Sequence, residues 1–165
     1  MSRESDADPA AGTRRDLNGR PIRPTRTERL RMLLSRRRDE PGPSVGDPRL
    51  AVVAESYDDA VAGSAVLDTA EWRPEAQTVL RHHLVLPPRA IEPATATAAL
   101  DEYVLDTDGV VAAASTAGVT PVAFARVQLV DALHLAQERS RMAGLAARHG
   151  GTVTGWQLLQ LPADL

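Results

Sequence analysis

The chain has 165 residues, of which 43% are hydrophobic but only 3% aromatic, so its core must be built mainly from Ala, Val and Leu. It contains no cysteine, which excludes disulfides, thiolate zinc sites and thiol nucleophiles. All 19 basic residues are arginine, and they are unevenly placed: residues 1–38 carry 11 arginines against 5 acidic residues (+6), and residues 39–165 carry 8 against 17 (−9). This asymmetry predicts a basic arm joined to an acidic folded body.

The basic arm is assigned to residues 1–48. Its first half has no periodic apolar positions, and residues 39–48 hold three prolines and two glycines, a composition that predicts a disordered arm ending in a linker. Between these parts, Thr25 and Glu28 have the spacing of a capping box. A short helix over residues 26–38 is therefore possible within the arm.

Arginines of this arm are candidates for contacts with RNA phosphates or with an acidic protein surface. The candidates are Arg26, Arg29, Arg36, Arg37 and Arg38. The arm has no aromatic residue to stack on bases, so any RNA contact is expected to be electrostatic and non-specific. A solvated tail that contacts nothing is the alternative interpretation.

Residues 49–78 form an N-terminal extension, and the sequence leaves open whether it joins the folded body. A short strand is predicted over residues 50–54. A weak, alanine-rich helix is predicted over residues 58–67, interrupted by Gly63.

The main domain is assigned to residues 79–165, where apolar residues recur with clear periods. Residues 121–130 alternate, with Arg126 and Gln128 on the side opposite the apolar residues, which predicts a half-exposed strand. Residues 131–149 carry an apolar stripe and end at a pair of glycines, which predicts the longest helix. The predicted elements run strand, helix, strand, strand, helix, strand, over residues 81–86, 94–105, 110–114, 121–130, 131–149 and 152–161.

This order predicts the α+β class and a ferredoxin-like βαββαβ sandwich, with two helices on one face of an antiparallel sheet. The disordered, Arg-rich N-terminal arm precedes it. A single helix through residues 122–149 is the alternative, and the alternation at Arg126 and Gln128 favours a strand followed by a helix.

Two segments of the main domain resemble a known family. The stretch AQERSRMAGLAARHGGTVTGWQ, residues 136–157, resembles the last helix and strand of the regulator of ribonuclease activity B family, in which a helix with a His-Gly-Gly stop leads into a strand bearing Gly-Trp. The segment HHLVLP, residues 82–87, is similar to the first strand of that family. The resemblance implies the same fold. It also implies docking on a ribonuclease E type endonuclease and inhibition of that enzyme through protein–protein contact.

The candidate partner-binding residues lie where this resemblance is most specific. They are Gly151, Gly155, Trp156 and Gln157. For Trp156 two interpretations remain: it packs on the helix 131–149 while Gly155 permits a bulge or a close backbone approach, or it is an exposed anchor for a protein partner.

The four histidines do not have the spacing of a metal site. His82 and His83 are adjacent on a strand and point to opposite faces, and His134 and His149 lie roughly 22 Å apart along a helix. The sequence also lacks a Gly-x-Ser-x-Gly elbow and a phosphate-binding glycine loop. We therefore predict no catalytic residue, no metal site and no cofactor.

The sequence favours a non-catalytic regulatory or adaptor protein that acts by protein–protein contact and modulates RNA decay. The alternative is a small-ligand-binding or cofactor-independent catalytic α+β domain that acts as a dimer, with Arg126, Gln128 or His83 turned into a pocket between sheet and helices. The oligomeric state is left open.

The longest charge-free stretch, residues 109–125, is shorter than the about 20 apolar residues that cross a bilayer. No secretory signal is visible at the start of the sequence. A cytoplasmic location without membrane contact is therefore expected.

Overall fold

The computed structural model describes residues 13–23, 42–110 and 118–163. Two predicted elements lie wholly or mostly outside the described residues. They are the helix 26–38, with the arginines proposed to contact RNA, and the strand 110–114. Within them, the chain forms five β-strands and three α-helices, which confirms the predicted α+β class.

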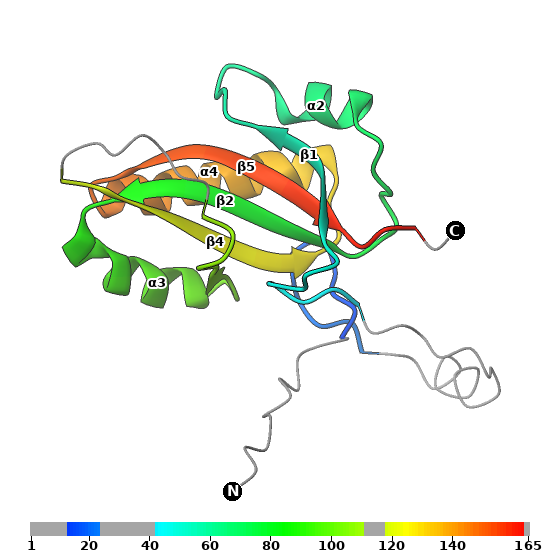
Figure 1. Ribbon diagram of the computed structural model, residues 1–165, viewed down its shortest axis with the longest axis horizontal. Coiled ribbons are helices and arrows are strands. Elements are labelled where there is room, and N and C mark those ends of the chain that lie inside the picture. The colour runs from blue at the N-terminus through cyan, green and yellow to red at the C-terminus, as the bar shows by residue number, and fades with distance from the viewer. Residues whose placement is uncertain (1–12, 24–41, 111–117, 164–165) are drawn as a thin grey trace, which may run out of the picture.

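The strands make one antiparallel sheet with the order β1-β5-β2-β4-β3 (Figure 1). The strands are β1 (Ala51–Ser56), β2 (Thr78–Leu86), β3 (Val104–Leu105), β4 (Thr120–Gln128) and β5 (Thr152–Gln160). The helices are α2 (Gly63–Thr69), α3 (Ile91–Ala99), which follows the short 3-10 turn η1 (Pro88–Ala90), and α4 (Ala132–Arg148). None of the helices in the described part of the chain is both long and apolar enough to cross a membrane.

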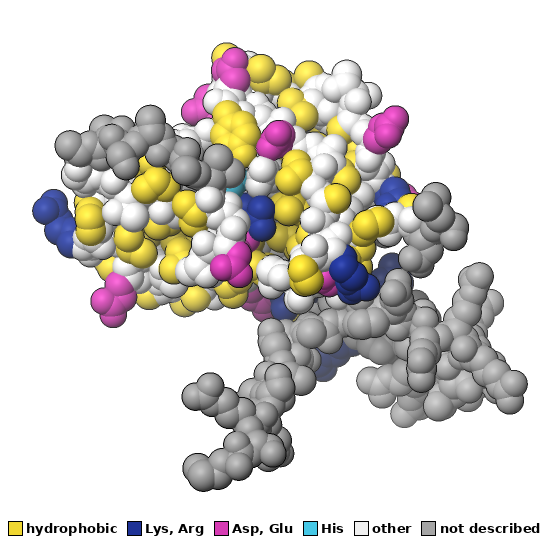
Figure 2. Space-filling view, viewed as in Figure 1, with side chains coloured by type: hydrophobic (Ala, Val, Ile, Leu, Met, Phe, Trp, Pro, Cys, Tyr) yellow, Lys and Arg dark blue, Asp and Glu magenta, His cyan; other side chains and the backbone are white. Residues whose placement is uncertain are grey.

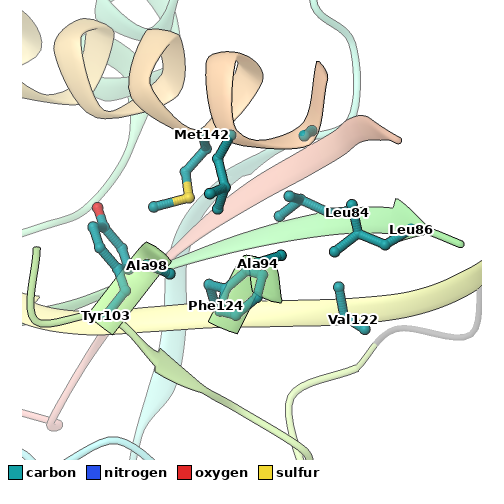
Figure 3. Packing of buried hydrophobic residues seen from close by; sticks show 10 residues of the cluster. Leu84, Leu86, Ala94, Ala98, Tyr103, Val122, Phe124 and Met142 are labelled. Carbon is teal, nitrogen blue, oxygen red and sulfur yellow. The ribbon is translucent and has the colours of Figure 1, made fainter. Parts of the chain in front are cut away.

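The side of the sheet that α3 and α4 cover, here called the helix face, carries the main core. Leu84 of β2 and Phe124 of β4 pack against Ala98 of α3 and Met142 of α4 (Figure 3). The rest of this buried cluster is Leu86, Ala94, Tyr103, Val122, Leu145 and Ala146. Because burying one such large apolar side chain stabilises a fold by about 1.5–3 kcal/mol, this cluster holds both helices on the sheet.

Helix α4 begins and ends close to the predicted bounds. The side chain of Asp131 caps its first turn by accepting a hydrogen bond from the backbone N–H of His134 at 2.7 Å. At the other end Gly150 has a φ of 72°, a left-handed conformation that glycine adopts without strain. Because β4 ends before Asp131, the alternative of one helix through residues 122–149 is wrong.

Helix α3 is shorter than predicted. It ends at Ala99 because the chain turns at Glu102, whose φ of 61° is incompatible with a continuing helix. The turn buries Tyr103 and places β3 next to β4. The strand that pairs with this edge of β4 is therefore β3 (Val104–Leu105). It comes earlier in the chain than the strand predicted over residues 110–114.

Two other elements differ from the predicted bounds. Strand β2 begins at Thr78 rather than at residue 81, because Val79 and Leu80 are paired with both neighbouring strands and are fully buried. Helix α2 begins at Gly63, the residue expected to interrupt it.

The segments before residue 79 belong to the same folded unit. Strand β1 pairs with β5 along its length, so the extension 49–78 joins the sheet. Residues 13–23 are also held in place: the carbonyl of Asp16 accepts a hydrogen bond from the N–H of Leu129 at 3.1 Å, and the N–H of Arg15 donates to Gln77 at 2.7 Å. This part of the predicted arm therefore contacts the folded body.

Candidate functional site

The sheet side opposite the helices, here called the open face, carries a polar cluster. Side chains alternate along a strand, so Leu84 and His82 point to the helix face and Arg81 and His83 to the open face. In Figure 1, α4 passes behind β5 and β2, and the space-filling view from the same direction shows mostly hydrophobic and uncharged atoms with single charged side chains between them (Figure 2). At one end of this face the strands are covered by the loop before β1, with Val45 and Leu50.

Gln157 of β5 is the centre of the polar cluster. Its Oε1 accepts a hydrogen bond from Nη1 of Arg81 at 3.1 Å and lies 3.1 Å from Nε2 of His83. Its Nε2 donates to the carboxylate of Glu55 at 2.8 Å. An arginine only donates and a carboxylate only accepts, so these two neighbours determine the orientation of the amide. Consequently Nε2 of His83 must carry the proton that bonds to Gln157.

Arg81 is held by a second partner in the turn that follows β3. Its Nε lies 2.7 Å from Oδ2 of Asp106, and both side chains are largely buried. The other oxygen of Asp106 accepts a hydrogen bond from the backbone N–H of Gly109 at 2.9 Å. The pair therefore fastens the turn to the sheet and compensates the charge of the arginine where it lies.

Burial favours the neutral form of the His83 imidazole. Only 4% of the residue is exposed, and this burial lowers the pKa of its imidazole below the ordinary value of 6.5, although the hydrogen bond to Gln157 acts in the opposite direction. With the proton on Nε2, the lone pair of Nδ1 remains a hydrogen-bond acceptor.

Tyr57 lies directly after β1 and covers Gly155. The centroids of the Tyr57 and His83 rings are 5.7 Å apart. A Cβ atom at Gly155 would come closer than 3.0 Å to the Tyr57 ring and to the carbonyl of Ser56. The predicted close backbone approach at Gly155 is thus confirmed, and the glycine creates the space in which a half-exposed tyrosine is held.

Replacing Gly155 by alanine is expected to lower the free energy of unfolding by about 1–3 kcal/mol, because the new methyl group must displace Tyr57 and the end of β1. The matched control is Gly144→Ala in α4, where the nearest side-chain atom is 3.4 Å away and better helix propensity should add about 0.5–1 kcal/mol. Urea unfolding of both variants measures the difference, and a neutral Gly155→Ala would contradict the close packing.

Trp156 is not an exposed anchor. It is 1% exposed on the helix face, where it packs with Leu67 of α2 and Leu135 of α4, so the packing interpretation is confirmed. Gly151 packs closely on the backbone of Val85. A Cβ atom at this position would come within 3.0 Å of the Val85 carbonyl oxygen, so the glycine has a packing role. Of the predicted partner-binding residues, only Gln157 contributes a side chain to the polar cluster.

Among the other members, the sequence singled out only His83, which was expected in a pocket between sheet and helices and lies on the open face instead. Glu55 and Tyr57 reach it because β1 pairs with β5, with Glu55 directly opposite Gln157. Arg81 reaches it because β2 is the other neighbour of β5. The only local signal was the alternation along β2, which separates Arg81 and His83 from the core positions.

The helix face carries a second polar cluster, which contradicts the prediction that Arg126 and Gln128 lie on a half-exposed side. Both are buried, and Nη2 of Arg126 lies 3.1 Å from the carboxylate of Glu138, which also accepts a hydrogen bond from the hydroxyl of Tyr103 at 2.8 Å. The other nitrogens of Arg126 donate to Gln128 and to the carbonyl of Asp101, each at 2.8 Å.

The polar side chains of this second cluster are bonded mainly to one another and to the backbone. All three side-chain nitrogens of Arg126 already donate to protein atoms, and His83 lies on the opposite face of the sheet. A cavity of about 340 Å³ lies beside β3, and Arg126 is part of its wall. Two other charged residues in this wall, Arg15 and Glu102, pair with each other. Nowhere in the described ranges do three His, Asp or Glu side chains gather as a possible metal site.

Comparisons with protein-family models, with curated proteins and with solved structures found no match to this chain. The resemblance to the regulator of ribonuclease activity B family therefore stays a prediction.

Proposed function

We propose that the chain is a non-catalytic regulatory protein that docks on a protein partner through the open face of its sheet. The observation that carries this proposal is the position of Tyr57, a half-exposed aromatic residue held in place by Gly155 and His83. Tyrosine and arginine are enriched among the residues that contribute most to protein–protein binding, and Arg81 lies in the same cluster.

Apolar side chains around the polar cluster support a docking role. Val52 is 45% exposed and Val104 is 48% exposed. Both point to the open face, because Val52 pairs with Leu159 and Val104 with Ala125, whose side chains lie there. These exposed apolar side chains beside a polar cluster give the open face both the apolar area and the hydrogen-bonding groups that protein–protein interfaces combine.

We propose a ferredoxin-like architecture for residues 78–160. The sheet order β5-β2-β4-β3, with α3 between β2 and β3 and α4 between β4 and β5, supports this assignment, and β1 is then an added edge strand. In such a sandwich the helices cover one face, and among the described residues the loop with Val45 covers only one end of the other face, which supports a docking role for the rest.

The resemblance makes a ribonuclease E type endonuclease the first partner to test, and the Arg-rich arm would add non-specific contact with RNA. If about five arginines neutralised phosphates of a single strand, a fourfold rise in salt would weaken RNA binding by about 100-fold.

The test is to immobilise the full chain and to measure how much of this endonuclease it retains. We expect Tyr57→Ala to weaken binding at least about tenfold, in the range of a docking hot spot, and Val52→Asp to weaken it as well. The matched control is Leu133→Ala, which removes a 63% exposed side chain from α4 and should have no effect. Equal retention of all variants would overturn the docking face, and no retention by the unmodified chain would overturn the choice of partner.

A further inference from the structure

The polar cluster of the open face contains two hydrogen-bond acceptors besides the donors of Arg81, namely the Glu55 carboxylate and Nδ1 of His83. His83 uses Nε2–H for Gln157, which leaves the lone pair of Nδ1. Among the described residues no side chain bonds to Nδ1 of His83, and 4% of this residue is exposed. The exposed carboxylate of Glu55 accepts one hydrogen bond from Gln157 and has capacity for others.

The charges of the cluster sum to −1. Glu55 and Asp106 are each negative, Arg81 is positive and bonded to Asp106, and burial favours the neutral form of His83. Because Arg81 is bonded to Asp106 and Gln157, it does not compete for Glu55. Residues 39–165 carry 17 acidic residues against 8 arginines, and residues 13–23 of the same body offset only part of this charge, with four arginines against one acidic residue. The local and the long-range fields therefore both attract a cation.

The ring of Tyr57 adds a flat surface beside this charge. Tyr57 is 48% exposed and follows Glu55 by two positions, and partial burial and then the negative charge of Glu55 raise the pKa of its hydroxyl above 10.0. A guanidinium stacks on an aromatic ring while its N–H groups donate in the plane, whereas an ammonium has no flat face to stack.

We infer that Glu55, Tyr57 and His83 form a recognition notch for an arginine side chain of the protein partner. The guanidinium stacks on Tyr57, donates to the carboxylate of Glu55 and donates a further hydrogen bond to Nδ1 of His83. This inference rests on the proposed docking function and gives the partner its chemistry: a basic, arginine-bearing segment.

The probe is a labelled hexa-arginine peptide, titrated into the full chain and followed by fluorescence anisotropy. We expect saturable binding that Glu55→Gln and Tyr57→Leu each weaken by about fivefold, with hexa-lysine binding more weakly and hexa-glutamate not at all. Glu92→Gln removes the same charge from an exposed position on α3 and is expected to weaken binding less than about twofold, because it acts only through the long-range field.

Equal effects of Glu55→Gln and Glu92→Gln would overturn the notch, because binding would then depend on net charge alone. No effect of Glu55→Gln would also overturn it, and this is the result expected if the arm of the same chain occupied the site. The two proposals can fail separately. If Val52→Asp no longer binds the endonuclease while Glu55→Gln binds the peptide as the unmodified chain does, the docking face is supported and the arginine notch is contradicted. Thermal unfolding of each variant confirms that it is folded.

Discussion

Replacement of Glu138 by alanine is expected to lower the free energy of unfolding by about 3–5 kcal/mol, the largest effect of any single substitution proposed for this protein. Glu138 and Arg126 form an ion pair between α4 and β4 in which each side chain is only 3% exposed. The loss of one partner leaves the other charge buried without compensation, and the hydroxyl of Tyr103 loses its acceptor.

The shift of the urea unfolding midpoint measures this effect. Glu92→Ala is the control, because Glu92 is an exposed glutamate on α3 and its removal should change the free energy by less than about 0.5 kcal/mol. A double replacement, Arg126→Met with Glu138→Leu, should be more stable than either single change, because it removes both charges together. Additive effects of the two single changes would contradict a coupled pair.

Acid is expected to destabilise the protein through His82. This residue is fully buried between Trp156 and Phe124 on the neighbouring strands, and neither ring nitrogen has a hydrogen-bond partner among the described residues. Burial, followed by the positive charge of Arg126, lowers the pKa of His82 from 6.5 to about 3. Between pH 6.5 and 3 the unfolded chain binds a proton at this residue that the folded protein does not, so stability falls with falling pH by up to about 1.4 kcal/mol per pH unit.

The variant His82→Leu should lose this part of the pH dependence and should be at least as stable as the unmodified protein at pH 7, because it removes two unpaired buried nitrogens. The test measures the unfolding midpoints of both proteins at several pH values between 7 and 4. Carboxylates titrate alike in the two proteins, so their contribution cancels in the difference between the midpoints. His149→Gln is the control, because this partly exposed residue follows α4 outside the core. An unchanged pH slope in His82→Leu would show that the histidine is protonated in the folded state.

Elements with complete local signals were predictable. Helix α4 has a capping residue at Asp131, an apolar stripe and a glycine stop, and each of these acts within a few residues of the chain. The alternation of β4 was also visible, but its inner side was assigned wrongly. Alternation separates two faces without showing which one is buried, and Arg126 is buried only because Glu138, twelve positions later, supplies its counter-charge.

The candidate site was less predictable than the fold. Gln157 was selected through the family resemblance, whereas Glu55 joins it from an edge strand about a hundred residues earlier. Strand register of this kind depends on packing between distant segments, which no local pattern contains. For the same reason Trp156 did not reveal its environment: a tryptophan in an alternating strand fits a core and an interface equally well until the helices are placed.

The hydrogen bonds that hold residues 13–23 at the end of β4 have a consequence for the arginine-rich stretch. Residues 24–41 are tethered to the same body at both ends, because the chain re-enters the fold at residue 42. Eighteen residues that must return can extend no further than roughly 30 Å from their anchors. A polyanion captured by these arginines is therefore confined near the sheet, at a raised effective concentration, so the two binding activities proposed here should reinforce each other on one ribonucleoprotein target.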